Sequence, residues 1–267
     1  MASSTSLFEQ TQSAPSGMWQ ALRWNLSRAL IVTRREVIDM LRDWRIVTPT
    51  ILLTIVFPGI ANWGANRMTG WMASYGAEIL AERMVPFLLL TVGFFPISFS
   101  LIIALESFVG EKERRSLEPL LATPLTDLQL YLGKTFAATV PPLLASLLGI
   151  TVYLVGVGIT LGWQPSLTLL AQIILLAVGE ALVMVSGAVV VSSQVTSVRA
   201  ANLLASFIII PMALLIQAEA LIMLWGQYYV LWAMVVGLFV IHLVLVRMGI
   251  RSFNREELLG AEIDELN

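Results

Sequence analysis

The chain has 267 residues, of which 57% are hydrophobic and 13% charged, and its formal net charge at pH 7 is −2. Soluble domains have roughly 45–50% apolar and about 25% charged residues, so this composition, with a mean hydropathy of +0.82, excludes an ordinary soluble protein. The lack of cysteine excludes disulfides, thiolate metal sites and a thiol nucleophile, and the small negative charge gives no reason to expect nucleic-acid binding.

Residues 18–45 are predicted to form an amphipathic helix, preceded by a polar cytoplasmic tail, residues 1–17, that we expect to be disordered. Apolar residues recur there every three or four positions and form one stripe, with Arg28, Arg35, Asp39 and Arg42 on the opposite side. Such a helix is typical of the membrane interface. The pattern leaves open whether it only binds lipid or also contacts a cytosolic partner. The stripe consists of Trp19, Leu22, Leu26, Leu30, Thr33, Val37, Met40 and Trp44.

Six later segments are long and apolar enough to cross a bilayer, for which a helix of about 20 residues suffices. The predicted fold class is therefore an all-α membrane protein with six transmembrane helices in a domain over residues 46–249. We expect residues 250–267 to be a cytoplasmic C-terminal tail, and the segment from Asn62 to Val85 to lie as a cap on the outer surface. The six spans cover residues 46–62, 86–109, 135–160, 167–192, 201–222 and 228–249.

The distribution of basic residues predicts the orientation. Arginine and lysine gather before the first span, between spans two and three, and after span six, whereas Arg67 and Arg83 fall on the other side. Because cytoplasmic loops carry an excess of Lys and Arg, both termini are predicted to be cytoplasmic.

A short charged insert between spans two and three is the most informative segment. Five charged residues, Glu111 to Arg115, are followed by Leu117, Leu120 and Leu121, which share one face of a short helix. Exposed leucines beside a charged run need a partner surface to cover them. Thr123-Pro124 ends this helix, and Thr126 with Gln129 predicts a capping box at the start of the next one. Residues 110–130 are thus predicted to form a cytosolic hairpin.

This insert resembles the loop after the second span of type-2 permeases of ATP-binding-cassette (ABC) transporters. That loop usually reads like E-R-E-x-G-T-L-E-x-L-L-x-T-P, followed by a leucine-rich turn and G-K. The chain has Arg115-Ser116 where the family often has Gly-Thr. The amphipathic helix, six spans and cytoplasmic termini also agree with the family plan. The matching residues are Glu111, Glu113, Leu117, Glu118, Leu120, Leu121, Thr123, Pro124, Gly133 and Lys134.

The resemblance implies that the insert is a coupling helix that docks on a separate ABC ATPase subunit, with the amphipathic helix beside it. It further implies an exporter in a bacterial or archaeal cytoplasmic (inner) membrane, with two permease chains, expected to be a homodimer, and two ATPase subunits. ATP and Mg would bind in the partner, and no cofactor, metal or catalytic residue is expected in this chain. The coupling residues would be Glu111, Arg114, Arg115, Leu117, Glu118, Leu120, Leu121, Thr123 and Pro124.

Two other classes of function are considered. A secondary transporter or channel working without a nucleotide is the main alternative, and a second charge within the spans would favour it. An intramembrane enzyme is the other class, but one histidine and no cysteine exclude the usual zinc ligand sets. Ser186 and His242 could be drawn as a serine–histidine pair, although no sequence geometry supports it. Gly133-Lys134-Thr135 is not a phosphate-binding loop, because Leu128 stands where that loop needs glycine.

Ionisable residues inside the spans are the candidates for the translocation path, since each is costly in lipid. Glu180 is near the middle of span four and shares a face with Gly187, a small residue typical of helix packing. Its role could be in the pathway or structural. Glu106 is near the cytoplasmic end of span two, and Glu219 is expected at the outer boundary.

Overall fold

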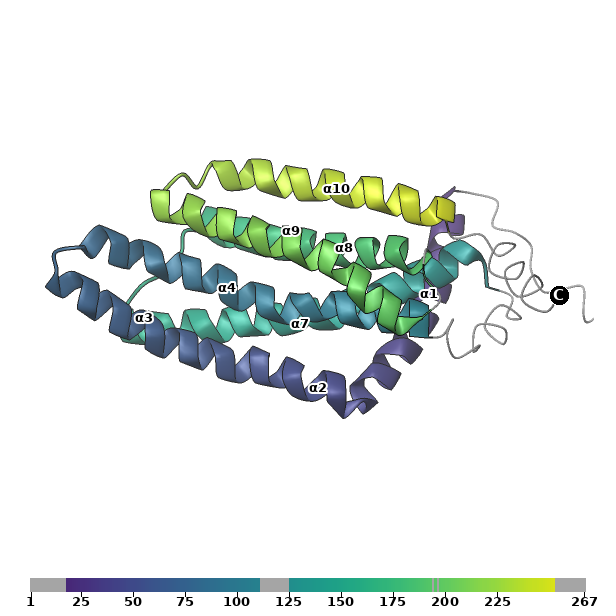
Figure 1. The fold of residues 1–267 in the computed structure, drawn as a ribbon, viewed down its shortest axis with the longest axis horizontal. Coiled ribbons are helices and arrows are strands. Elements are labelled where there is room, and N and C mark those ends of the chain that lie inside the picture. Colours follow the sequence, from purple (N-terminus) through teal and green to yellow (C-terminus); the bar gives the residue numbers. More distant parts are fainter. Residues whose placement is uncertain (1–17, 111–124, 194, 196, 253–267) are drawn as a thin grey trace, which may run out of the picture.

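The computed structural model describes residues 18–110, 125–193, 195 and 197–252, which form an elongated bundle of helices (Figure 1). No β-strand occurs among these residues, which confirms the predicted all-α class. The elements are α1 (Met18–Arg42), α2 (Trp44–Ile51), the π-helical turn η1 (Leu52–Val56), α3 (Phe57–Ser74), α4 (Glu78–Leu105), the π-helical turn η2 (Glu106–Gly110), α7 (Asp127–Leu161), α8 (Leu167–Ser193), α9 (Val198–Trp225) and α10 (Val230–Ser252).

Six helical segments of the described chain are long and apolar enough to cross a membrane, as predicted. They run alternately up and down the bundle, so α1 and the end of α10 lie at the same end (Figure 1). We call this the α1 end, and we call the opposite end, where α3 turns into α4 and α9 into α10, the far end. The segments are Trp44–Ser74, Glu78–Val109, Gln129–Leu161, Leu167–Ser192, Arg199–Trp225 and Val230–Gly249.

The centre of the bundle is formed by α4 and α8, most of whose membrane segments are buried, whereas less than a third of each other membrane segment is buried. Helix α4 packs against α3, α7, α8 and α9, and α8 also packs against α10. The outer helices expose large apolar side chains such as Phe207 and Leu243. In a bilayer these faces meet lipid tails that are as apolar as leucine, so they need no protein cover.

The first membrane helix is longer than predicted, and the expected outer cap over residues 62–85 is wrong. Helix α3 continues to Ser74, a turn with Gly76 at φ +72° follows, and α4 begins at Glu78. Asn62, at the predicted end of the first span, and Asn66, one turn later, point to α7. The Asn62 amide donates to the Tyr153 backbone carbonyl at 3.0 Å, and the Asn66 amide donates to a threonine hydroxyl of α7. Because the amide nitrogens are paired in this way, both residues fit within an extended helix.

The amphipathic helix ends earlier than predicted. Helix α1 stops at Arg42, and Asp43 begins a new helix, because its side chain accepts a hydrogen bond from the Arg45 backbone N–H at 2.9 Å. An aspartate at this N-cap position satisfies one of the helix's otherwise unpaired backbone donors. Trp44, assigned from the sequence to the end of the amphipathic stripe, therefore belongs to the first membrane segment.

Helix α7 approaches its neighbours closely where its own side chains are small. At Gly156, an added Cβ would overlap the side-chain amide of Asn62 on α3. Earlier in α7, Ser146 donates a hydrogen bond to the Gly93 carbonyl of α4 at 2.6 Å. Small residues and interhelical hydrogen bonds are how helices associate in a membrane.

We expect Gly156→Ala to destabilise the protein, because the new methyl group would displace Asn62 from its hydrogen bond to α7. Inserting a methyl group into a packed contact costs about 1–3 kcal/mol. Gly158→Ala is the matched control, since the nearest atom to an added Cβ there is 3.9 Å away. Thermal unfolding of the purified proteins should show a lower midpoint for Gly156→Ala alone. Equal midpoints for the two variants would contradict the close contact.

Candidate functional site at the α1 end

The candidate coupling residues lie outside the described part of the chain. These are Glu111, Arg114, Arg115, Leu117, Glu118, Leu120, Leu121, Thr123 and Pro124. The structure describes the two stems between which this insert runs, namely η2 at the end of α4 and the first turns of α7. The candidate site is built from these stems and from α1, which packs on α7 (Figure 1).

The start of α7 has the predicted capping box. The Gln129 backbone N–H donates to Thr126 Oγ1 at 3.3 Å, and the Thr126 N–H donates to Gln129 Oε1 at 3.2 Å. The two residues thereby satisfy each other's backbone donors at the helix start. The second stem of the insert thus begins at a defined residue.

One close approach and two hydrogen bonds hold α1 against this stem. Gly133 lets the helices approach so closely that an added Cβ would lie 2.6 Å from the Val32 Cβ. Thr33 Oγ1 donates to the Gly133 carbonyl at 3.0 Å, and the Gln129 side-chain amide donates to Asn25 Oδ1 at 2.7 Å. The glycine of the family's Gly-Lys pair is therefore where α1 and α7 meet.

The face of α1 that packs on α7 overlaps the predicted apolar stripe only in part, at Thr33. Val32 and Thr33 are buried there, together with Ala29, whereas Leu30 of the predicted apolar stripe is 57% exposed. Helix α1 thus uses one face for protein contact and leaves Trp19 and Leu30 of its apolar stripe exposed. The location of that stripe in the membrane interface stays a prediction.

Lys134 is the central residue of this junction, although sequence reasoning used it only as part of a motif. Its side chain is 1% exposed. The ammonium group donates to the Ser107 carbonyl at 2.9 Å and to Ser107 Oγ at 3.1 Å, and it lies 3.5 Å from Glu36 Oε1. Ser107 Oγ in turn donates to Glu36 Oε2 at 3.2 Å. One buried cation therefore joins α7, η2 and α1, the elements that flank the insert.

Glu106 lies beside this network. Together with Glu36 and Ser107 it lines a cavity of about 260 Å³ between α1, the end of α4 and α7, which Asp39 and Asp43 also line. Among the described residues, no group of three or more side chains could hold a metal ion. Glu106 is half-buried and has interaction partners of its own. This location agrees with the predicted position near the end of span two.

Glu180 lies inside the bundle, as expected, but it has a partner that sequence reasoning missed. Glu180 on α8 is 2% exposed, and its carboxyl group interacts with that of Glu219 on α9. Glu219, which was expected at the outer boundary, is 0% exposed and lies against the carboxyl group of Glu180, a residue near the middle of α8. Three of the four carboxyl oxygens have no hydrogen-bond partner among the described residues, namely Glu180 Oε1 and both Glu219 oxygens. The signal available in the sequence was a second glutamate within an apolar span.

The face of Glu180 also packs as predicted at Gly187. An added Cβ at Gly187 would lie 2.9 Å from Ile208 Cδ1 of α9, so this glycine brings α8 and α9 together. The same pair of helices carries the two glutamates. The candidate translocation residues Glu180 and Gly187 thus belong to one helix interface, whereas Glu106 belongs to the α1 end.

Ser186 and His242, which no sequence geometry joined, do meet in the structure. His242 Nδ1 lies 2.9 Å from Ser186 Oγ and 3.2 Å from the Leu182 carbonyl, and Ser186 Oγ also donates to that carbonyl. These bonds link α10 to α8. Among the described residues, the hydrogen-bond partner that this pair shares is the Leu182 backbone carbonyl, whereas a catalytic histidine is typically oriented by a carboxylate.

Comparison with known proteins agrees with this architecture. The family model described as ABC-2 type transporter matches residues 28–218, which run from α1 through the insert to α9. The chain matches no curated protein.

We expect Lys134→Met to destabilise the protein, because it keeps the chain length and removes the cation that binds Glu36 and Ser107. Hydrogen bonds to charged groups contribute about 1.5–3 kcal/mol. Arg35→Met is the matched control, since the Arg35–Asp39 pair is well exposed at 3.9 Å, and such pairs contribute less than about 1 kcal/mol. Chemical unfolding of both variants measures the difference. A Lys134→Met protein as stable as Arg35→Met would show that the network contributes little.

Proposed function

The chain belongs to the ABC-2 type transporter family and is the permease component of an ABC transporter, and we propose that it forms the translocation path of an ATP-driven exporter. In this proposal two copies of the chain make a homodimer, and each copy is coupled to a separate ATPase subunit through the insert between α4 and α7. ATP and Mg would bind in the ATPase subunits.

The observation that carries the coupling proposal is the Lys134 network. The insert begins and ends at η2 and α7, and Lys134 ties those two elements to each other and to α1. A displacement of the insert by an ATPase subunit would move these elements together, because a buried cation with three acceptors resists separation. The motion would reach the centre of the bundle through α4, which packs on α8 and α9.

The proposed orientation has the α1 end in the cytoplasm of a bacterial or archaeal cell and the membrane segments in its cytoplasmic membrane. Arg34 and Arg42 lie at this end, on α1, and Arg247 lies in the last two turns of α10. Arg67 and Arg83 lie in the far half of α3 and near the start of α4. This asymmetry is what the preference of basic residues for the cytoplasmic side would produce.

The translocation path is proposed to run along the α8–α9 interface with Glu180 at its gate. The support is the burial of Glu180 against Glu219, because carboxyl groups inside a membrane are costly and mark pathways or proton relays. Gly187 lies on the same face of α8 as Glu180 and keeps α8 and α9 close together. A change in the packing of these two helices would therefore alter access to the glutamate pair.

One observation favours the second candidate, a transporter that works without a nucleotide. A second ionisable residue within the spans favours such a mechanism, and Glu219, which lies against Glu180, is one. The two candidates differ in their energy source. Transport by this chain alone in ATP-free vesicles would support the second candidate and exclude the ATP-driven exporter.

We expect Leu120→Asp to abolish copurification with the ATPase subunit, because it would bury an unpaired charge in the docking surface. Such a change costs about 2–5 kcal/mol, which lowers affinity about 30-fold or more. Ser74→Asp, an exposed position at the far end, is the control that adds the same charge away from the proposed interface. The measurement is the amount of ATPase retained with equal amounts of permease. Full retention by Leu120→Asp would exclude the insert as the docking element.

We expect Glu180→Gln to fold and assemble normally and to change the pH dependence of ATP hydrolysis by the reconstituted complex, since glutamine keeps the size but does not titrate. Glu180→Leu should in addition lower stability by about 1–3 kcal/mol, because Glu219 loses its polar neighbour. Glu78→Gln, at the exposed start of α4, is the control. If the Gln variant keeps the wild-type pH profile and only the Leu variant is unstable, Glu180 is a packing residue.

A further inference from the structure

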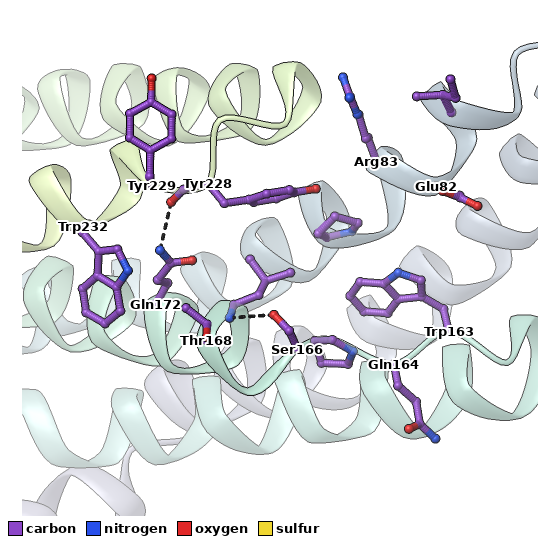
Figure 2. Close-up of a pocket in the computed structure, with 14 residues that line it drawn as sticks. Glu82, Arg83, Trp163, Gln164, Ser166, Thr168, Gln172, Tyr228, Tyr229 and Trp232 are labelled. Carbon is purple, nitrogen blue, oxygen red and sulfur yellow. Dashed lines mark hydrogen bonds between the residues drawn. The ribbon is translucent and has the colours of Figure 1, made fainter.

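The far end of the bundle contains a cavity of about 540 Å³ that the transport proposal does not use. It lies between the first turns of α4, the connection from α7 to α8, and the turn from α9 to α10 (Figure 2). Its volume falls within the range of about 300–1,000 Å³ that is typical of small-molecule sites. The cavity is open to the surroundings of the bundle and is built from three segments that are distant in the sequence.

A buried polar group with an unused acceptor faces this cavity. Gln172 on α8 is 2% exposed, and its amide nitrogen donates to the Tyr228 carbonyl at 2.9 Å. This bond fixes which end of the side chain is oxygen. Gln172 Oε1 has no hydrogen-bond partner among the described residues, although a buried amide oxygen normally has one. A ligand that donates a hydrogen bond would satisfy it.

The remaining lining combines aromatic rings with uncharged polar groups. Figure 2 shows Trp163 and Trp232 on either side of the polar row formed by Gln172, Thr168 and Ser166. Such rings offer large flat apolar surfaces with a polar edge. Tryptophan and tyrosine are also common at membrane interfaces in general. A plain interfacial belt, however, does not enclose a cavity with an unsatisfied buried amide.

The lining has no net charge and so favours neither a cation nor an anion. Glu82 and Arg83 are the charged members among the described lining residues, and they have opposite signs. Arg83 is held in place by its bond to the Leu224 carbonyl at 2.6 Å. The cavity therefore suits a neutral ligand that has an apolar face for the rings and hydroxyl groups for the amide and hydroxyl side chains.

We propose that this cavity is a binding site for a hydroxylated sugar ring, either free or as the headgroup of a glycolipid. The ring's apolar face would lie against Trp163, and one of its hydroxyls would donate to Gln172 Oε1. In the proposed orientation the site faces the non-cytoplasmic side. The site itself is independent of the export proposal, because binding needs neither the ATPase subunit nor transport.

The test uses the full chain in nanodiscs of phosphatidylcholine, a lipid without sugar. Radiolabelled octyl glucoside below its micellar concentration is the probe, and octyl tetraoxyethylene, with the same chain and no sugar, is the matched competitor. We expect saturable binding of octyl glucoside that octyl tetraoxyethylene does not displace. Displacement by free glucose would identify a site for free sugar. Displacement by octyl glucoside alone would identify a glycolipid headgroup site.

Two variants test the assigned residues. Gln172→Leu should weaken octyl glucoside binding about three- to tenfold through the lost hydrogen bond, and Trp163→Ala should weaken it about tenfold through the lost ring surface. Gln217→Leu removes an exposed amide of α9 that does not line the cavity, and it should bind as the wild type does. Thermal unfolding of each variant confirms that it is folded.

Three results would overturn the proposal. They are equal binding of the two octyl compounds, no saturable binding of octyl glucoside, and wild-type affinity in both folded cavity variants. Because the permease is assayed alone, any of these results leaves the ATPase-coupling experiment unaffected. Conversely, loss of ATPase retention in Leu120→Asp says nothing about the sugar site.

Discussion

The close approach of α7 to α1, α3 and α4 is the constraint on which the rest of the architecture depends. In lipid, no hydrophobic effect drives helices together, so small residues and interhelical hydrogen bonds must do so. Helix α7 has Gly133 against α1, Gly156 against α3 and Ser146 bonded to a carbonyl of α4. Two of these contacts occur at glycines, where the helix backbones come close, and the third is a hydrogen bond to a backbone carbonyl. They therefore fix the distances between the helix axes. Helix α1, α3 and the central helix α4 are thus all positioned against this one helix.

The two ends of the bundle differ in chemistry. At the α1 end, a buried ammonium group, Lys134, binds a carboxylate and a backbone carbonyl from two other elements. At the far end, the connections surround an open cavity lined by aromatic rings and by the amide of Gln172. Charge at one end suits coupling to a soluble protein that applies force. A neutral, ring-lined cavity at the other end suits a small ligand at the opposite membrane surface.

Between these ends lie the buried carboxyl groups of Glu180 and Glu219, which are costly inside a bundle. Neither carboxyl group has a cation beside it among the described contacts, and three of the four oxygens have no hydrogen-bond partner there. A fold selected for stability alone would favour apolar residues at such positions. Two carboxyl groups at a helix interface that Gly187 brings together are the observation behind our proposal that this pair takes part in the passage of substrate or protons.

Local patterns in the sequence determined much of this protein: six apolar spans, a capping box at Thr126 and the insert that indicates the permease family. These features depend on neighbouring residues and on the bilayer thickness, so no knowledge of packing is needed. Which helix faces which was decided by the tertiary structure alone. It turned Asn62 from an apparent span end into a contact with α7, buried Glu219 against α8 and left the oxygen of Gln172 facing a cavity. A polar residue in an apolar run reads the same in sequence whether its partner is water, lipid headgroups or another helix, and only the fold supplies that partner.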